Sequence, residues 1–154
     1  MQTNRHLAHV LPFARRPLVF LTAVTRRRAP VLASQTAFTV LTEIWRRSAD
    51  IDGWFVGDYL LMPDHVHLFA KGAIDAKPLA AWVASWKSLS SRRLKAAAGI
   101  TPPLWQPDYF DRFLRTDESY RAKWDYVAWN PVRKQFCQHP DGWPWKGRLF
   151  DIER

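Results

Sequence analysis

Residues 54–71 decide the fold, and they read WFVGDYLLM, then Pro63-Asp64, then HVHLFAK. Both flanking runs are rich in apolar, aromatic and β-branched residues, which is typical of β-strands. The proline and aspartate between them are residues that favour a tight turn. The stretch therefore predicts a β-hairpin whose two strands cover residues 54–62 and 65–71.

The segments on either side extend this hairpin into a larger pattern. Residues 18–25 (LVFLTAVT) predict a buried strand, and apolar residues recur with a helical period between residues 34 and 48. Pro78 begins a long predicted helix that ends near Gly99, and a fourth strand is expected from Tyr109 onward. Thr116 or Asp117 is then expected to cap a last helix.

This order of elements is the ferredoxin-like one, β-α-β-β-α-β, followed by an additional helix. It predicts an α+β fold with an antiparallel sheet and two helices on one face. The other face of the sheet is left for the last helix or for a ligand.

Length and composition indicate one folded domain over residues 1–154, with an irregular arm at residues 1–17. The chain is 47% hydrophobic and 24% charged, which favours a packed core over disorder. It contains no apolar run of about 18 residues, so no membrane-spanning helix is expected, and its first residues do not resemble a secretory signal. A single cysteine excludes a disulfide scaffold and a cysteine-based zinc site, and it suits a reducing cytoplasm.

The charge balance points to a polyanionic partner. Lys and Arg number 23 against 14 Asp and Glu, which gives a formal net charge of +9. Nucleic acid is the simplest such partner, and a solvated basic surface is the alternative. The nine tryptophans suit both base stacking and core packing, and most of them are expected in the core.

Two histidines lie on the second strand of the predicted hairpin. His65 and His67 are two residues apart, so their side chains point to the same face, while Val66 and Leu68 point to the core. Two neighbouring imidazoles can bind one divalent metal ion. A pair of half-exposed surface histidines is the alternative, and the spacing alone does not decide between them.

Tyr126 and Asn130 form a second candidate pair on the last helix. They are four residues apart and so share a helix face, although Pro131 disfavours a helical conformation at Asn130. A tyrosine hydroxyl needs a metal or a base to act as a nucleophile, and an asparagine oxygen can bind a hard cation. The spacing alone favours a plainer interpretation, in which Tyr126 is a core residue and Asn130 ends the helix.

Four segments together resemble a known family. Residues 59–68 (YLLMPDHVHL) resemble the HUH motif of the single-tyrosine transposases, in which U is an apolar residue. Residues 105–112 (WQPDYFDR) are similar to the fourth-strand region of that family, residues 126–133 (YVAWNPVR) to its tyrosine helix, and residues 143–145 (WPW) to a common ending. The combination most resembles the REP-associated tyrosine transposases, which act on repetitive extragenic palindromes folded as DNA hairpins.

The resemblance implies a ferredoxin-like fold and a divalent metal, Mg or Mn, bound by His65, His67 and Asn130, with Tyr126 as the nucleophile. It implies a metal-dependent single-strand DNA endonuclease and strand transferase that forms a 5′-phosphotyrosine link and releases a 3′-hydroxyl. The implied partner is single-stranded or hairpin DNA, with no membrane, and the protein would be a monomer or homodimer at the nucleoid of the bacterial cytoplasm.

Further residues are weaker candidates. Five basic residues could contact DNA or simply be solvated, namely Lys87, Arg92, Arg93, Arg112 and Arg115. Asp64 could orient a histidine, although turn chemistry explains it equally well.

Two other functions remain as alternatives. One is an HUH replication or conjugation nicking protein, which often carries two tyrosines on one helix. Tyr120 lies on the far side of the helix from Tyr126 and makes such a pair poor. The other is a non-catalytic regulator that binds DNA or RNA hairpins on the same fold.

Overall fold

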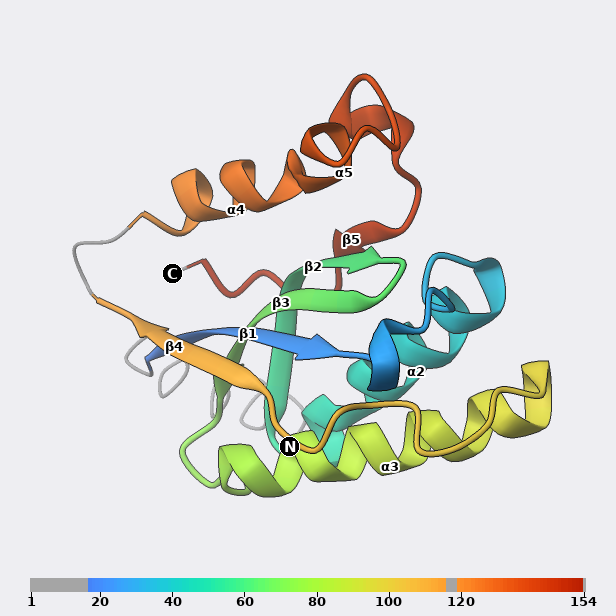
Figure 1. Cartoon of the computed structure of the whole chain (residues 1–154). Coiled ribbons are helices and arrows are strands. Elements are labelled where there is room, and N and C mark those ends of the chain that lie inside the picture. Colours follow the sequence, from blue (N-terminus) through green and yellow to red (C-terminus); the bar gives the residue numbers. More distant parts are fainter. Residues whose placement is uncertain (1–16, 116–118, 154) are drawn as a thin grey trace.

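The computed structural model describes residues 17–115 and 119–153, and its described part is a five-stranded antiparallel sheet with helices on both faces (Figure 1). Along the chain the strands and helices are β1 (Leu18–Val24), α2 (Gln35–Ile51), β2 (Trp54–Met62), β3 (His65–Gly72), α3 (Leu79–Ala98), β4 (Phe110–Leu114), α4 (Tyr120–Ala128), α5 (Asn130–Arg133) and β5 (Lys146–Arg148). Two short 3-10 helices, η1 (Arg26–Arg28) and η2 (Pro140–Gly142), complete the order. None of the helices described is long and apolar enough to cross a membrane.

The strand order is β4-β1-β3-β2-β5. The ferredoxin-like order predicted from the sequence is confirmed, with α2 and α3 on one face and α4 on the other (Figure 1). Strand β5, which pairs with β2, was not predicted, because three residues are too short to show an alternating pattern. The arm expected at residues 1–17 lies, apart from Pro17, outside the described residues.

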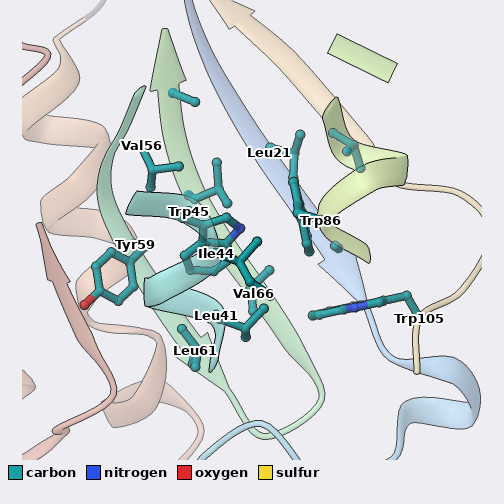
Figure 2. Close-up of a cluster of buried hydrophobic side chains, with 14 of the residues drawn as sticks. Leu21, Leu41, Ile44, Trp45, Val56, Tyr59, Leu61, Val66, Trp86 and Trp105 are labelled. Carbon is teal, nitrogen blue, oxygen red and sulfur yellow. The ribbon is translucent and has the colours of Figure 1, made fainter. Parts of the chain in front are cut away.

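The main core lies between the sheet and the layer of α2 and α3 (Figure 2). Trp86 of α3 is at its centre and meets Trp45 of α2 and Trp105 edge-on, at ring distances of 5.6 and 5.3 Å. Six of the nine tryptophans are buried, which confirms the expectation that most serve the core: Trp45, Trp54, Trp82, Trp86, Trp105 and Trp124.

A β-bulge interrupts the pairing of β2 with β3. The register shifts between Val56 and Tyr59, so β2 carries one residue more than β3 over this stretch. Because of the extra residue, Val56 and Tyr59 both face the helix layer although they are three positions apart. The bulge leaves the backbone N–H of Asp58 to donate to the hydroxyl of Tyr120 on α4, at 2.9 Å.

Helix α4 covers part of the second sheet face. Its Trp124, Val127 and Ala128 form a smaller apolar cluster with sheet residues that include Leu60 and Phe69. The helix begins at Tyr120 and is capped by Ser119, whose hydroxyl accepts the N–H of Ala122 at 3.0 Å. Thr116 and Asp117, which were predicted to cap this helix, lie outside the described residues. Their prediction as the cap was wrong, because the helix begins at Tyr120, whose hydroxyl is bonded to Asp58 of β2.

Candidate functional site

The two histidines lie on the sheet face opposite α2 and α3. His67 is in register with Thr22 of β1 and Leu60 of β2, and Thr22 is in register with Phe110 of β4, so one row crosses four strands. His65 lies in the next row toward the turn. The two imidazole rings meet edge-on, with their centroids 4.8 Å apart. The alternation predicted from the sequence therefore holds, since Val66 and Leu68 are fully buried on the other side.

Each imidazole is oriented through its Nδ1 atom. The Nδ1 atom of His67 lies 2.8 Å from the Thr22 hydroxyl, and that of His65 lies 2.7 Å from the Asp64 carboxylate. The other oxygen of Asp64 accepts from Arg28 at 3.1 Å. This arrangement leaves the two Nε2 atoms as the nitrogens that can bind a cation, which is how protein metal sites commonly orient histidine.

The protonation state of His67 also suits a metal ligand. Burial, together with the electrostatic effects of His65 and Lys123, lowers the pKa of His67 to about 3. The ring is therefore neutral at pH 7, which is the form that binds metals. Phe20 stacks on the same ring at 5.4 Å and helps to exclude water from it.

The carboxylate beside His65 is ionised at neutral pH. Burial alone would raise the pKa of Asp64, but the hydrogen bonds from His65 and Arg28 outweigh burial and lower it. The two partners hold the carboxylate in place, and the carboxylate in turn orients His65.

Tyr126 is on the solvent side of α4, and its side chain is 63% exposed. The plainer interpretation of Tyr126 as a core residue was therefore wrong. Lys123 is near both Tyr126 and the surroundings of His67. Its ammonium nitrogen lies 6.0 Å from the centroid of the Tyr126 ring and 4.9 Å from that of the Phe20 ring, which stacks on His67. The Arg133 guanidinium lies over the Tyr126 ring at 4.1 Å, a cation–π contact.

Asn130 lies just beyond the end of α4, where the helix is broken at Trp129 and restarts as α5. The kink expected near Pro131 is present, but Asn130 itself is the first residue of α5, so the expectation that Pro131 would keep Asn130 out of a helical conformation was wrong. The Asn130 side-chain oxygen accepts a hydrogen bond from Arg133, which also donates to the Tyr126 carbonyl at 2.7 Å. One guanidinium thus holds both Tyr126 and Asn130.

The candidate metal ligands combine imidazole nitrogens, which favour borderline divalent metals, with an amide oxygen, which favours hard ones. Among the described residues no group of three or more His, Cys, Asp or Glu side chains is placed to hold a metal. The candidate set is instead two imidazole nitrogens and one amide oxygen, and that oxygen accepts a hydrogen bond from Arg133 in this structure.

The candidate DNA-binding residues fall into two groups. Lys87, Arg92 and Arg93 are on α3, on the opposite side of the sheet from the histidines (Figure 1). Lys87 donates to the carbonyls of Gln106 and Asp108, and burial lowers its pKa.

The two arginines of α3 are paired locally, whereas Arg112 and Arg115 belong to β4 and to the residue that follows it. Arg92 donates to Ser88, and Arg93 forms an ion pair with Glu43 at 2.6 Å. Arg112 is on β4 in register with Phe20, which puts it on the histidine face, and Arg115 follows that strand.

Three residues of this site were not identified from the sequence, namely Thr22, Lys123 and Arg133. Lys123 precedes Tyr126 by three residues and Arg133 follows it by seven, so helical spacing could have found both. Thr22 could not be found in this way, because its partner His67 is on another strand and only the register brings them together.

Residues 18–127 match a protein family model described as transposase, IS200 like. The chain belongs to the IS200-like transposase family. The matched part contains His65, His67 and Tyr126, and it ends before Asn130.

Relatives and solved structures agree with this assignment. The REP-associated tyrosine transposase of Escherichia coli K12 is 23% identical over 141 residues, which are 88% of this chain and 78% of that protein. The structure of a REP-associated tyrosine transposase bound to a REP hairpin has a similar fold, with a TM-score of 0.66 at 20% identity over 90% of this chain and 84% of that one. A Deinococcus radiodurans R1 protein named as a transposase has a TM-score of 0.56 at 25% identity, over 78% and 91% of the two chains. The resemblance to the REP-associated branch and the predicted fold are confirmed.

Proposed function

We propose that this protein is a metal-dependent single-strand DNA endonuclease and strand transferase that acts on hairpin DNA, with Tyr126 as its nucleophile. One observation carries the proposal. An exposed tyrosine is on the helix that covers the sheet face bearing His65 and His67, whose Nδ1 atoms are both already engaged.

The substrate class follows from charge and from the relatives. A net charge of +9 favours a polyanion, and the solved relative that carries a REP hairpin has the same fold. An unpaired strand can turn its phosphate toward an exposed tyrosine more freely than a strand held in a duplex. We therefore expect the cleaved bond to lie in a single-stranded segment beside the hairpin stem.

The reaction exchanges one phosphate ester for another. The Tyr126 oxygen attacks the phosphorus atom, the bond to the 3′ oxygen breaks, the phenol proton passes to solvent, and the released 3′ oxygen takes up a proton. The product is a 5′-phosphotyrosine, and a 3′-hydroxyl can reverse the step because the ester is conserved. Lys123 and Arg133, which flank the Tyr126 ring, supply positive charge for the phosphate.

His65, His67 and Asn130 are the residues that would hold Mg or Mn. A bound divalent cation would neutralise charge on the non-bridging oxygens of the scissile phosphate. Asn130 would take part most readily after Arg133 releases its side-chain oxygen, because the guanidinium and the cation would otherwise share one acceptor atom. The freed guanidinium then remains beside Tyr126, where it can contact the DNA.

The test uses a labelled DNA hairpin with single-stranded flanks, incubated with the full chain in Mg or in EDTA. A covalent protein–DNA band on a denaturing gel is expected in Mg only. Tyr126→Phe should abolish the band, whereas Tyr109→Phe, which changes a tyrosine near β4, should keep it. Salt-sensitive hairpin binding by the wild type with no covalent band under any metal would instead favour the non-catalytic regulator.

A further inference from the structure

A cavity of about 270 Å³ opens beside His65. Of the four proposed site residues it is lined by His65 alone, and not by His67, Tyr126 or Asn130. Three segments form its walls, and the lining residues are Arg28, Pro30, Met62, Pro63, Asp64, His65, Lys134 and Phe136.

Phe136 gives this cavity a flat apolar wall. Its side chain is 51% exposed, and its ring stacks on Trp143 at 5.5 Å with an angle of 23° between the planes. Trp143 is in turn fixed to β2, because its indole N–H donates to the Leu61 carbonyl at 2.9 Å. An aromatic ring that is backed on one side and lines a cavity is suited to stacking a nucleobase.

Two cations stand around the same cavity. Arg28 and Lys134 are both exposed, and they come from η1 and from the residue after α5. The Asp64 carboxylate, which also lines the cavity, does not repel an anion strongly, since its two oxygens are already bound to Arg28 and His65. An aromatic wall beside exposed cations matches the chemistry of a nucleotide, which carries a base and a phosphate.

Two of the three segments that form the cavity contain or adjoin backbone conformations that non-glycine residues seldom adopt. Arg27 and Arg28 have φ values of 56° and 51°, and Gln135, between Lys134 and Phe136, has a φ of 65°. Left-handed conformations are unfavourable for such residues and persist only where the surroundings hold them. Here they aim Arg28 from one side and Lys134 and Phe136 from the other toward one space.

We propose that this cavity binds one unpaired nucleotide of the DNA strand next to the scissile phosphate, with its base stacked on Phe136 and its phosphate between Arg28 and Lys134. The cavity is slightly smaller than the roughly 300–1,000 Å³ typical of small-molecule pockets, so it suits one nucleotide and not a duplex stem. The adjacency to the scissile phosphate rests on the proposed function, whereas the binding itself does not.

The test measures binding without cleavage. A fluorescent DNA hairpin with single-stranded flanks is titrated with the full chain in EDTA, and each flanking nucleotide is replaced in turn by an abasic one. For wild type, one abasic position should weaken binding by roughly 5- to 100-fold, as loss of a stacked base predicts. In Phe136→Leu the intact hairpin should bind more weakly by a similar factor, and that abasic position should cause little further loss.

Controls separate stacking from a folding defect. Phe113→Leu changes a phenylalanine that is also half exposed but lies on the helix side of β4, and it should leave the abasic profile unchanged. Phe136→Tyr keeps the ring and should restore binding. Lys134→Gln should reduce the slope of log K against log salt by about 1, the effect of losing one phosphate contact. Lys95→Gln on α3 should leave this slope unchanged.

The two proposals fail separately. If every abasic position weakens binding by the same factor in Phe136→Leu as in the wild type, no base stacks on Phe136 and the nucleotide site is refuted. This holds even if the covalent adduct forms normally. Coupling at one position without any covalent adduct in Mg would support the site and refute the proposed catalysis.

Discussion

Two tyrosines on α4, six positions apart, have opposite surroundings. Tyr120 is buried, stacks on Phe69 at 4.5 Å, donates to the Asp58 carboxylate at 2.7 Å and accepts the Asp58 N–H. Burial raises the pKa of its phenol well above the usual range, so it stays protonated. Tyr126 is exposed and flanked by cations. The first tyrosine is a structural residue, and the second is available for chemistry.

The two tyrosines should therefore respond differently to loss of the hydroxyl. Tyr120→Phe leaves the buried N–H of Asp58 without its partner and should lower the free energy of unfolding by about 1–3 kcal/mol. Tyr126→Phe should change it by less than about 0.5 kcal/mol, because the group is on the surface. Urea denaturation of both variants measures this difference. Equal stabilities would contradict the role assigned to Tyr120.

His67 should make the metal-free protein sensitive to acid. Its pKa is about 3 in the folded chain and about 6.5 when unfolded, so the unfolded state binds one more proton between these values. The stability tied to neutral His67 is present above pH 6.5 and is lost as the pH falls toward 3, by about 1 kcal/mol per pH unit near pH 5.

Urea denaturation in EDTA at several pH values checks this expectation. His67→Gln, which does not titrate, should lose stability less steeply than the wild type between pH 6.5 and 4. Parallel curves for the two proteins would show that His67 is not buried in its neutral form.

At the scale of elements, the sequence was most informative where a pattern is local. Runs rich in apolar and β-branched residues around a Pro-Asp turn located β2 and β3, and helical periodicity located α2 and α3 to within a few residues. The attachment of α4 was not predictable in this way. It depends on Asp58, which is 4% exposed and bonded to Tyr120 and Arg148, residues 62 and 90 positions away. Nothing in the local sequence indicates that an aspartate inside a strand has these partners.

Gly57 offers a test of how this attachment positions Tyr126. A Cβ atom at this position would lie 2.5 Å from the Tyr120 hydroxyl oxygen and 2.7 Å from Ile152. Gly57→Ala should therefore displace α4, reduce the free energy of unfolding by about 1–3 kcal/mol, and slow covalent adduct formation although every site residue is intact.

A glycine elsewhere provides the matched control. In Gly142→Ala the new Cβ would meet only Cys137, at an ordinary 3.5 Å, so stability and adduct formation should both be retained. Normal adduct formation by Gly57→Ala would mean that the anchoring of α4 does not position the nucleophile.

At the scale of the whole molecule, the two faces of the sheet have different tasks. The sequence predicted that His65 and His67 share one face, but it could not show that Lys87 supports a loop, since its partners are carbonyl oxygens about twenty residues away. A basic helix looks the same in sequence whether its charges contact DNA or the protein itself.

Salt dependence distinguishes the two faces. Binding of a flanked hairpin should weaken steeply with salt, and Arg112→Gln on the histidine face should reduce the slope of log K against log salt by about 0.7–0.9. Arg93→Gln should leave the slope unchanged, because Arg93 is paired with Glu43 on the helix layer. A reduced slope for Arg93→Gln would support the sequence-based prediction that it contacts DNA, and would place DNA on both sides of the sheet.

The bulge in β2 also determines which changes of chain length this fold can accept. Removing one residue from residues 57–58 would straighten the strand but reverse the side-chain direction of one half of it. Either Val56 or the pair Tyr59 and Leu61 would then leave the core. An insertion or deletion in the connection at residues 73–78 has no such effect, because that segment pairs with no strand. We expect natural relatives to vary in length there and to keep the number of residues between Val56 and the histidine turn constant.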